Sequence, residues 1–391
     1  MNSDAQRSAF VRTYILPFLD MRRNLVFLGT FLGLFGYNLV LTVSTYDLAS
    51  AGYWDILAYF AGAFILTGFV YWPLLYMGFS ALDGVAWRAF IFLTQLLSML
   101  AYIYISVGPV LLGLISGVLL APFWCVHHIA MVQNTSKENR GYEVTLSMLI
   151  TTGAAVIASA LSGYYLEIQN ESMANGLALA GMALGTLCLL LASKIIRQHS
   201  MRAFIGECRR IIKLNPYMAR RILSQSVYDI PSLTIASLMY LMGLSPTIMA
   251  TVFIARLAVM FVISPFIGTV AHTYRRHAYA IGLALIGVAW VLLACAPPNG
   301  ITFFAFIMLY GIGLRFANSS LMTGLYEMQS YASMLWTETF WAIGRIGGLF
   351  ALTPLMFYNT YLYLFVLVGL TGLIFVLNRK WQQTYINAQA M

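Results

Sequence analysis

The stretch Lys194–Arg221 reads KIIRQHSMRAFIGECRRIIKLNPYMARR and divides the chain into two parts. It holds eight of the 22 Lys and Arg residues of the sequence, and the segments on either side are almost wholly apolar and aromatic. Lys and Arg concentrate in the cytoplasmic connections of membrane proteins. The stretch therefore predicts a cytoplasmic connector between two hydrophobic halves.

The composition excludes an ordinary soluble domain. The chain is 61% hydrophobic and 9% charged, whereas soluble domains average about 45–50% apolar and about 25% charged residues. Its apolar residues recur in segments of about 20, the length that crosses a hydrocarbon core about 30 Å thick. The net charge of +9 is spread over the connections between these segments, so we expect a lipid bilayer as the partner and no nucleic acid.

The hydrophobic pattern predicts twelve membrane spans, six before the connector and six after it, preceded by a short interfacial helix within residues 8–23. We expect an N-terminal six-helix bundle over 1–196, a basic cytoplasmic linker over 197–216 and a C-terminal six-helix bundle over 217–391. The predicted spans are 24–45, 54–76, 86–106, 108–132, 144–167, 174–195, 219–243, 246–270, 278–296, 301–325, 333–356 and 360–378.

The basic residues also predict how the chain is oriented. With the N-terminus inside, every outside connection lacks Lys and Arg, and the outside connections instead carry acidic residues such as Asp47 and Asp55. Such an asymmetry is the positive-inside pattern. We therefore expect both termini and the connector in the cytoplasm, and a location in a bacterial inner (plasma) membrane.

Two cytoplasmic connections at matching places in the two halves share a motif. The first reads GFSALDGVAWR over 78–88 and the second reads GTVAHTYRR over 268–276. Both resemble the loop signature of the major facilitator superfamily, a Gly followed by an Asp and then basic residues. The first copy has an extra residue before its acid, and the second has His272 where the family has an acid. The matching residues are Gly78, Asp83 and Arg88 in one copy, and Gly268, Arg275 and Arg276 in the other.

The resemblance implies an all-α fold of two six-helix bundles related by a pseudo-two-fold repeat. Members of this superfamily are secondary transporters that work by alternating access around a site near the middle of the membrane. The resemblance further implies that the first, fourth, seventh and tenth spans line a central cavity. We expect a monomer without a cofactor.

Three arginines fall within predicted spans of the second half, Arg256, Arg315 and Arg345. A charged side chain at that depth is costly unless it faces protein, water or a partner. A planar guanidinium matches carboxylate or phosphate, which predicts a site for an anionic group. Asn318 lies three residues after Arg315, on the same helix face. The alternative is that the arginines form internal ion pairs with Asp229 and Glu338.

Asp229 and Glu338 are the candidate proton-coupling acids. Asp229 precedes Pro231, where we expect a kink in the seventh span. Glu338 and Arg345 are two helical turns apart, with Trp341 between them on the same face. A titratable acid close to a basic substrate site is one interpretation of this face, and a structural polar seam is the other.

The fourth predicted span carries Trp124, His127 and His128 after Pro122. Histidine titrates near neutral pH, so these side chains are candidates for substrate or proton contact, with packing as the alternative. Adjacent residues on a helix point about 100° apart, and we expect no metal site. Tyr37 and Asn38 of the first span are further candidates for the cavity.

Together these features predict a transporter that moves a small to medium anionic or amphipathic solute, coupled to protons by symport or antiport. The alternatives are an exporter of drug-like or siderophore-like compounds, and a transporter-like receptor, scaffold or assembly factor. We expect no enzyme: the sequence has no Gly-rich loop ending in Gly-Lys-Ser/Thr and no nucleophile–base motif.

The predicted orientation can be tested with a membrane-impermeant thiol reagent on intact cells. A single cysteine placed at Asn170 or Asn299 should react from outside, whereas native Cys208 should react only after the membrane is opened. Protection of Asn299→Cys in intact cells, together with labelling after permeabilisation, would contradict the six-plus-six arrangement.

Overall fold

The computed structural model describes residues 3–76, 84–105, 107–168, 171–193, 246–297, 299–327 and 331–389, together with 202, 205, 206, 209, 238 and 241–243. Most of the predicted linker 197–216 and most of the predicted span 219–243 lie outside the described residues. So do Gly78, Asp83 and Asp229, whose predicted roles remain predictions.

The described chain is a series of long helices. Helix α1 (Ser3–Tyr14) and the 3₁₀ helix η1 (Leu16–Leu19) come first. The long helices of the first half are α2 (Met21–Ala51), α3 (Tyr53–Tyr76), α4 (Gly84–Tyr104), α5 (Pro109–Asn134), α6 (Arg140–Glu167) and α7 (Glu171–Ala192). Those of the second half are α10 (Pro246–Thr273), α11 (Arg275–Cys295), α12 (Gly300–Glu327), α13 (Tyr331–Tyr358) and α14 (Thr360–Gln389).

Ten of these helices, α2, α4 to α7 and α10 to α14, are long and apolar enough to cross a membrane. Each coincides with a predicted span. The N-terminal segment differs from the prediction: in place of one helix within 8–23, α1 ends at Tyr14 and α2 already begins at Met21. Pro17 lies in the intervening 3₁₀ turn, and the Asp20 side chain accepts hydrogen bonds from the Arg22 and Arg23 backbone N–H groups. Asp20 is thus the N-cap of α2, which begins at Met21, before the start of the predicted span at residue 24.

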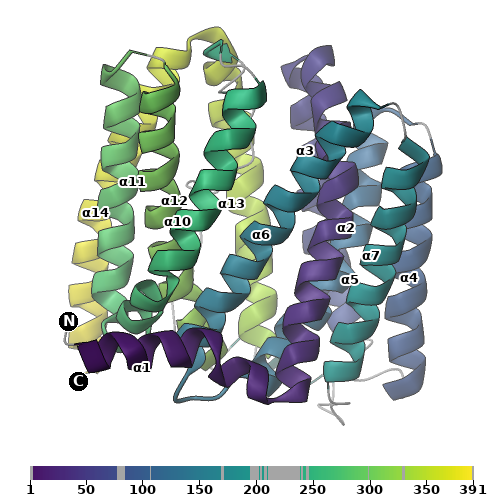
Figure 1. The fold of residues 1–391 in the computed structure, drawn as a ribbon, viewed down its shortest axis with the longest axis horizontal. Helices are drawn as coiled ribbons and strands as arrows, with labels where there is room; N and C mark the ends of the chain where they lie inside the picture. The colour runs from purple at the N-terminus through teal and green to yellow at the C-terminus, as the bar shows by residue number, and fades with distance from the viewer. Residues whose placement is uncertain are drawn as a thin grey trace.

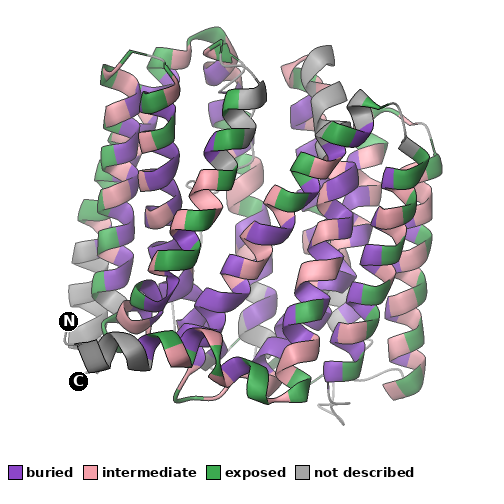
Figure 2. Cartoon of the chain, in the orientation of Figure 1, coloured by how far each residue is buried: buried purple, intermediate pink, exposed green. Residues whose placement is uncertain are grey.

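The long helices form two bundles that stand side by side (Figure 1). In the first half, α2 packs on α6 and α7, and α3 and α4 pack on α5. In the second half, α11 packs on α12 and α14, and α10 packs on α12. The halves meet where α6 contacts α10, α3 contacts α13, and α12 contacts α5 and α6. Buried residues line the inner sides of the helices, while exposed apolar residues cover the outer sides (Figure 2).

The N-terminal helix α1 lies across the lower end of the long helices (Figure 1) and contacts both α6 and α10. The Tyr14 ring stacks on Phe261 of α10 with a centroid distance of 4.7 Å, and its hydroxyl donates to the Phe261 carbonyl. That carbonyl lacks its usual donor because Pro265, four residues later, has no N–H. Burial raises the pKa of the Tyr14 hydroxyl to about 12, so it stays a donor at neutral pH. The first half thereby contacts a proline-containing helix of the second.

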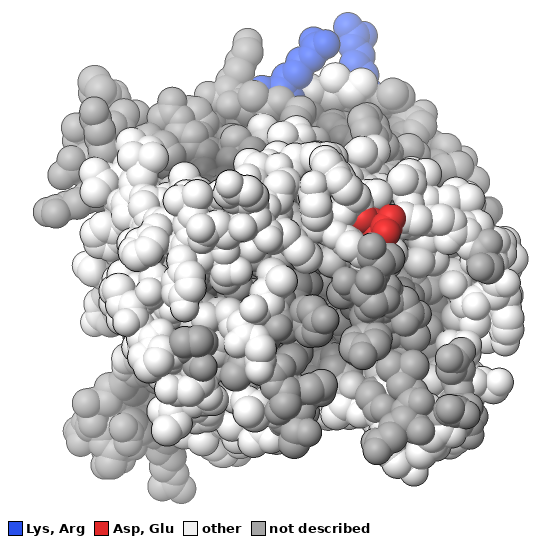
Figure 3. Space-filling model, turned by 90° about the horizontal axis from the view of Figure 1, so that it is seen from above, with Lys and Arg blue, Asp and Glu red and all other residues white. Residues whose placement is uncertain are grey.

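The opposite end of the molecule carries little charge on its described surface (Figure 3). It includes the turn at Gly52, whose φ of 139° is accessible mainly to glycine. This is the end that the basic-residue pattern predicts to lie outside.

Close helix packing within the first half depends on glycines. Gly29, Gly33 and Gly36 of α2 face Gly181 and Gly185 of α7. A Cβ atom at Gly181 would lie 2.9 Å from the Leu32 carbonyl oxygen. Small residues of this kind let backbones approach closely, and that packing drives helix association in lipid.

We therefore expect Gly181→Val to lower the thermal stability of the purified protein. The added side chain would push α2 from α7, a distortion that costs about 1–3 kcal/mol in comparable overpacked sites. Gly176→Val is the matched control on the same helix, because a Cβ atom there meets nothing within 4 Å. Melting temperatures in detergent report both. Equal melting temperatures for the two variants would contradict the packing role of Gly181.

Candidate functional site: a cavity shared by the two halves

A cavity of about 290 Å³ lies where the halves meet, lined by α3, α5 and α6 of the first and α12 and α13 of the second. Its volume is near the lower end of the range of small-molecule sites, about 300–1,000 Å³. Each helix contributes one face, as the spacing shows: Leu314, Asn318, Met322 and Tyr326 on α12, and Val144, Ser147, Met148 and Thr151 on α6. Both series recur at three or four residues, the spacing of one helix face.

A hydrogen-bonded chain crosses from one half to the other at one side of this cavity. His128 of α5 contacts the Tyr326 hydroxyl of α12 through Nδ1 at 2.8 Å and the Glu338 carboxylate of α13 through Nε2 at 3.0 Å. Tyr326 is 2% exposed and Glu338 8% exposed. All three side chains therefore sit in surroundings where an unmatched polar group is expensive. Glu338 and His128, predicted separately as site residues, are partners.

The neighbouring His127 is held in a defined tautomer. Its Nδ1 lies 3.0 Å from the Thr30 hydroxyl, and that hydroxyl donates to the Val26 carbonyl at 2.7 Å. A hydroxyl has one hydrogen to donate, so His127 Nδ1 carries the hydrogen and donates to Thr30. The neutral ring then has Nε2 as an acceptor. His127 also lines the cavity.

The second polar region of the cavity is formed by Arg345 and Trp341. The Arg345 guanidinium carbon lies 5.3 Å from the ring centroids of both Phe64 and Trp341. Such contacts place a cation against the negative face of an aromatic ring. Glu338, Trp341 and Arg345 all line the cavity, as their spacing on one helix face predicts.

The other two predicted arginines do not line this cavity. Arg315, 7% exposed, donates from Nη2 to the Thr152 hydroxyl of α6. Arg256 packs against Gly311, and its buried Nε has no hydrogen-bond partner among the described residues. Asn318 lines the cavity although Arg315 does not. Substrate binding by Arg315 and Arg256 stays a prediction.

The two candidates on α2 belong to the interior of the first half. The Tyr37 hydroxyl is 3.0 Å from the Ser116 hydroxyl, and Asn38 donates from Nδ2 to the Leu34 carbonyl at 2.6 Å. Neither lines the cavity, whereas Trp124 on α5 does.

The loop-motif residues that the structure describes lie at the lower ends of the bundles. Arg88 donates from Nη2 to the Ser193 carbonyl at 2.6 Å, just beyond the end of α7. Gly268 lies against Tyr142 of α6, where a Cβ atom would approach the Tyr142 ring to 2.9 Å. Arg275 and Arg276 begin α11.

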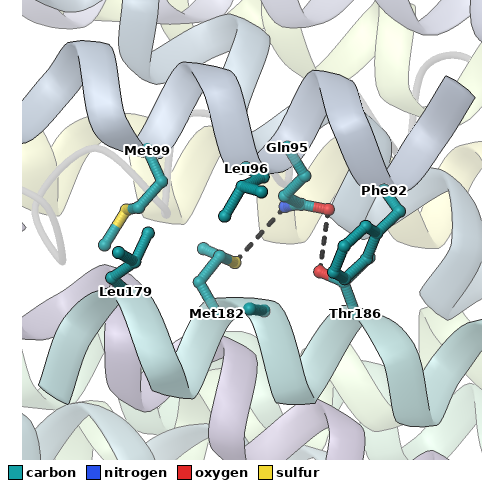
Figure 4. Close-up of a pocket in the computed structure, with 8 residues that line it drawn as sticks. Phe92, Gln95, Leu96, Met99, Leu179, Met182 and Thr186 are labelled. Atoms are coloured by element: carbon teal, nitrogen blue, oxygen red, sulfur yellow. Dashed lines mark hydrogen bonds between the residues drawn. The ribbon is translucent and has the colours of Figure 1, made fainter. Parts of the chain in front are cut away.

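A buried polar group between α4 and α7 is fully used in packing and is no second site. Gln95 donates to the Leu119 carbonyl at 2.8 Å. It also accepts from the Thr186 hydroxyl at 2.9 Å, and its Nε2 lies 3.3 Å from the Met182 sulfur (Figure 4). In the part of the chain that the structure describes, no three His, Cys, Asp or Glu side chains gather as a metal site would require.

Tyr326 and the cavity-lining face of α6 were not among the predicted site residues. The signal for Tyr326 is its spacing from Asn318, two successive steps of four residues. For α6 the signal is the polar pair Ser147 and Thr151, also four apart.

Fold and site together define the class: an all-helical, multi-pass membrane protein of two bundles with a polar cavity between them. No protein-family model and no curated protein sequence matches the chain. Solved structures do match in fold. The human organic anion transporter MFSD10 is 15% identical, with a TM-score of 0.66 over 91% of this chain and 98% of that one.

Two further structures agree with this result. A bacterial homologue of the iron transporter ferroportin, in its outward-facing state, is 13% identical with a TM-score of 0.69. The nucleoside transporter NupG is 11% identical with a TM-score of 0.62. Each match covers 93% of this chain and 100% of the other. The chain has the major facilitator superfamily fold, as the loop motifs predicted.

We expect Tyr326→Phe to destabilise the protein, because the change keeps the ring and leaves His128 Nδ1 without its partner. A buried group stripped of its hydrogen bond typically costs about 1–3 kcal/mol. Tyr358→Phe is the control, since Tyr358 is 86% exposed. The melting temperatures of the two variants test the prediction, and a Tyr326→Phe protein as stable as Tyr358→Phe would contradict it.

Proposed function

We propose that this chain is a secondary active transporter that carries a small to medium anionic or amphipathic organic solute across the membrane, coupled to protons. The observation that carries the proposal is a cavity built from both halves and lined by polar groups, among them the His128–Glu338 pair that joins the halves. The structures that share the fold support the class, since their names describe transporters of an organic anion, a nucleoside and iron. Those substrates differ, so fold similarity does not choose the solute.

Alternating access requires the contacts between the halves to break on one side of the cavity and form on the other. Polar contacts between described residues of the two halves include His128 with Tyr326 and Glu338, Thr145 with Ser319 at 3.2 Å, and Arg315 with Thr152. The His128 contacts lie near helix ends, because α5 ends at Asn134, α12 ends at Glu327 and α13 begins at Tyr331. In this proposal the contacts of His128 with Tyr326 and Glu338 form the cytoplasmic gate.

Proton binding would act on this gate through the direction of its hydrogen bonds. An ionised Glu338 only accepts, so His128 Nε2 donates to it and the two groups attract. A protonated Glu338 is neutral and the charge attraction is lost. Among the described residues, Cys125, His127, Tyr326 and Arg345 are further titratable or charged groups around this pair. Protonation of Glu338 thus favours separation of the halves.

The proposal includes no covalent chemistry, and we place the protein as a monomer in a bacterial inner membrane. Asp229 remains a second candidate acid. A protein that opens alternately to the two sides of the membrane yet moves no solute would instead be a transporter-like receptor or scaffold.

We expect Glu338→Gln to abolish pH-gradient-driven solute accumulation in proteoliposomes while leaving exchange of solute down its own gradient. The amide copies the neutral form of the acid and cannot release a proton. Uptake and counterflow of a metabolite panel, with and without a pH gradient, measure the two activities separately.

Glu138→Gln is the matched control, because Glu138 is an exposed acid in the connection between α5 and α6. It should behave as the unmodified protein does. Asp229→Asn is assayed in parallel. If accumulation driven by the pH gradient persists in Glu338→Gln and in Asp229→Asn, proton coupling through these acids is wrong.

A further inference from the structure

The Trp341 indole N–H is a buried donor with no acceptor in the part of the chain that the structure describes. Trp341 is 9% exposed and lines the cavity, and its Nε1 has no hydrogen-bond partner among the described residues. Buried polar groups in folded proteins are nearly always paired. A ligand acceptor atom that reached this N–H from the cavity would supply the missing hydrogen bond.

Arg345 adds donors beside this position. It lies one helical turn beyond Trp341 on the same face of α13. The rings of Phe64 and Trp341 lie against its guanidinium. A guanidinium carries five N–H donors in its plane and no acceptor. Indole and guanidinium donate and never accept, so the complementary ligand group is a pure acceptor with negative charge, as a carboxylate is.

The acid of the cavity is engaged elsewhere. Glu338 lies seven residues before Arg345, about 10 Å along the helix, and one of its oxygens contacts His128 Nε2 at 3.0 Å. The cavity therefore has an acidic side, where Glu338 contacts His128 of the first half, and a donor side formed by Trp341 and Arg345. This arrangement favours an anion over an organic cation.

The remaining walls suit a flat apolar group. Trp124, Phe64 and Trp341 all line the cavity, and aromatic walls favour ring stacking. A volume of about 290 Å³ excludes peptides and whole lipids but admits a single substituted ring system. We infer that the cavity binds an aromatic carboxylate, with its carboxylate at Trp341 Nε1 and Arg345 and its ring against the aromatic walls. Binding of this ligand does not depend on transport. Only its identification as the transported solute rests on the proposed function.

Equilibrium binding to the purified full chain in detergent tests the inference without any transport step. The probes are benzoate, phenylacetate and indole-3-acetate, each compared with its neutral amide and with the amine of the same ring: benzylamine, phenethylamine and tryptamine. Titration calorimetry should give at least one carboxylate about tenfold tighter binding, equivalent to about 1.4 kcal/mol, than its amide and its amine.

Substitutions then assign the contact. Trp341→Phe keeps an aromatic wall and removes the N–H, so carboxylate affinity should fall about tenfold while amine affinity stays unchanged. Arg345→Gln should remove the preference for carboxylate over amide. Trp290→Phe is the matched control, because Trp290 is 1% exposed within the core of the second half and packs against Phe306 and Tyr310. Melting temperatures of all variants confirm that each is folded at the temperature of titration.

Three results would overturn the inference: no binding by any carboxylate, tighter binding of the amines, or unchanged carboxylate affinity in Trp341→Phe. The binding test and the transport test can fail independently of each other. Carboxylate binding without uptake would leave the ligand class standing and remove transport. Proton-driven uptake of a solute that is not an aromatic carboxylate, without binding of these probes, would do the reverse.

Discussion

The contact between His128 and Glu338 joins two bundles that otherwise share mainly apolar surface. A charged or strongly polar pair costs solvation energy when it is buried, and breaking it leaves each partner unmatched. Apolar helices in lipid gain little from moving apart or together, since the lipid is as apolar as they are. The relative position of the halves is therefore sensitive to a few polar contacts, and in the proposed mechanism the protonation state of the Glu338 carboxylate shifts it.

The fold was predictable because the bilayer imposes it. A hydrocarbon core offers no partner for backbone groups, so spans must be helices of nearly fixed length. Each described long helix coincides with a predicted span for that reason. The start of α2 was not predicted, because the N-cap at Asp20 is a local hydrogen-bonding choice that hydropathy does not record.

The site was predictable only within single helices. Glu338, Trp341 and Arg345 share a face of α13, and spacing alone places them together. Spacing does not show which neighbouring helix that face contacts. Arg315 and Asn318 are three residues apart, yet one reaches Thr152 and the other lines the cavity. The pairing of His128 with Tyr326 and Glu338 joins residues about 200 positions apart, and it depends on the tilt and rotation of packed helices.

The hydrogen bond from Tyr14 to the Phe261 carbonyl has a consequence for the order of assembly. Helix α1 emerges from the ribosome before α10, and its acceptor lies in α10, which follows seven predicted spans and the connector. Domains form roughly in the order in which they are synthesised. The Tyr14 ring therefore has no partner on α10 until the second bundle has inserted and Pro265 has freed its carbonyl. Docking of α1 is then a late event that marks a completed two-bundle protein.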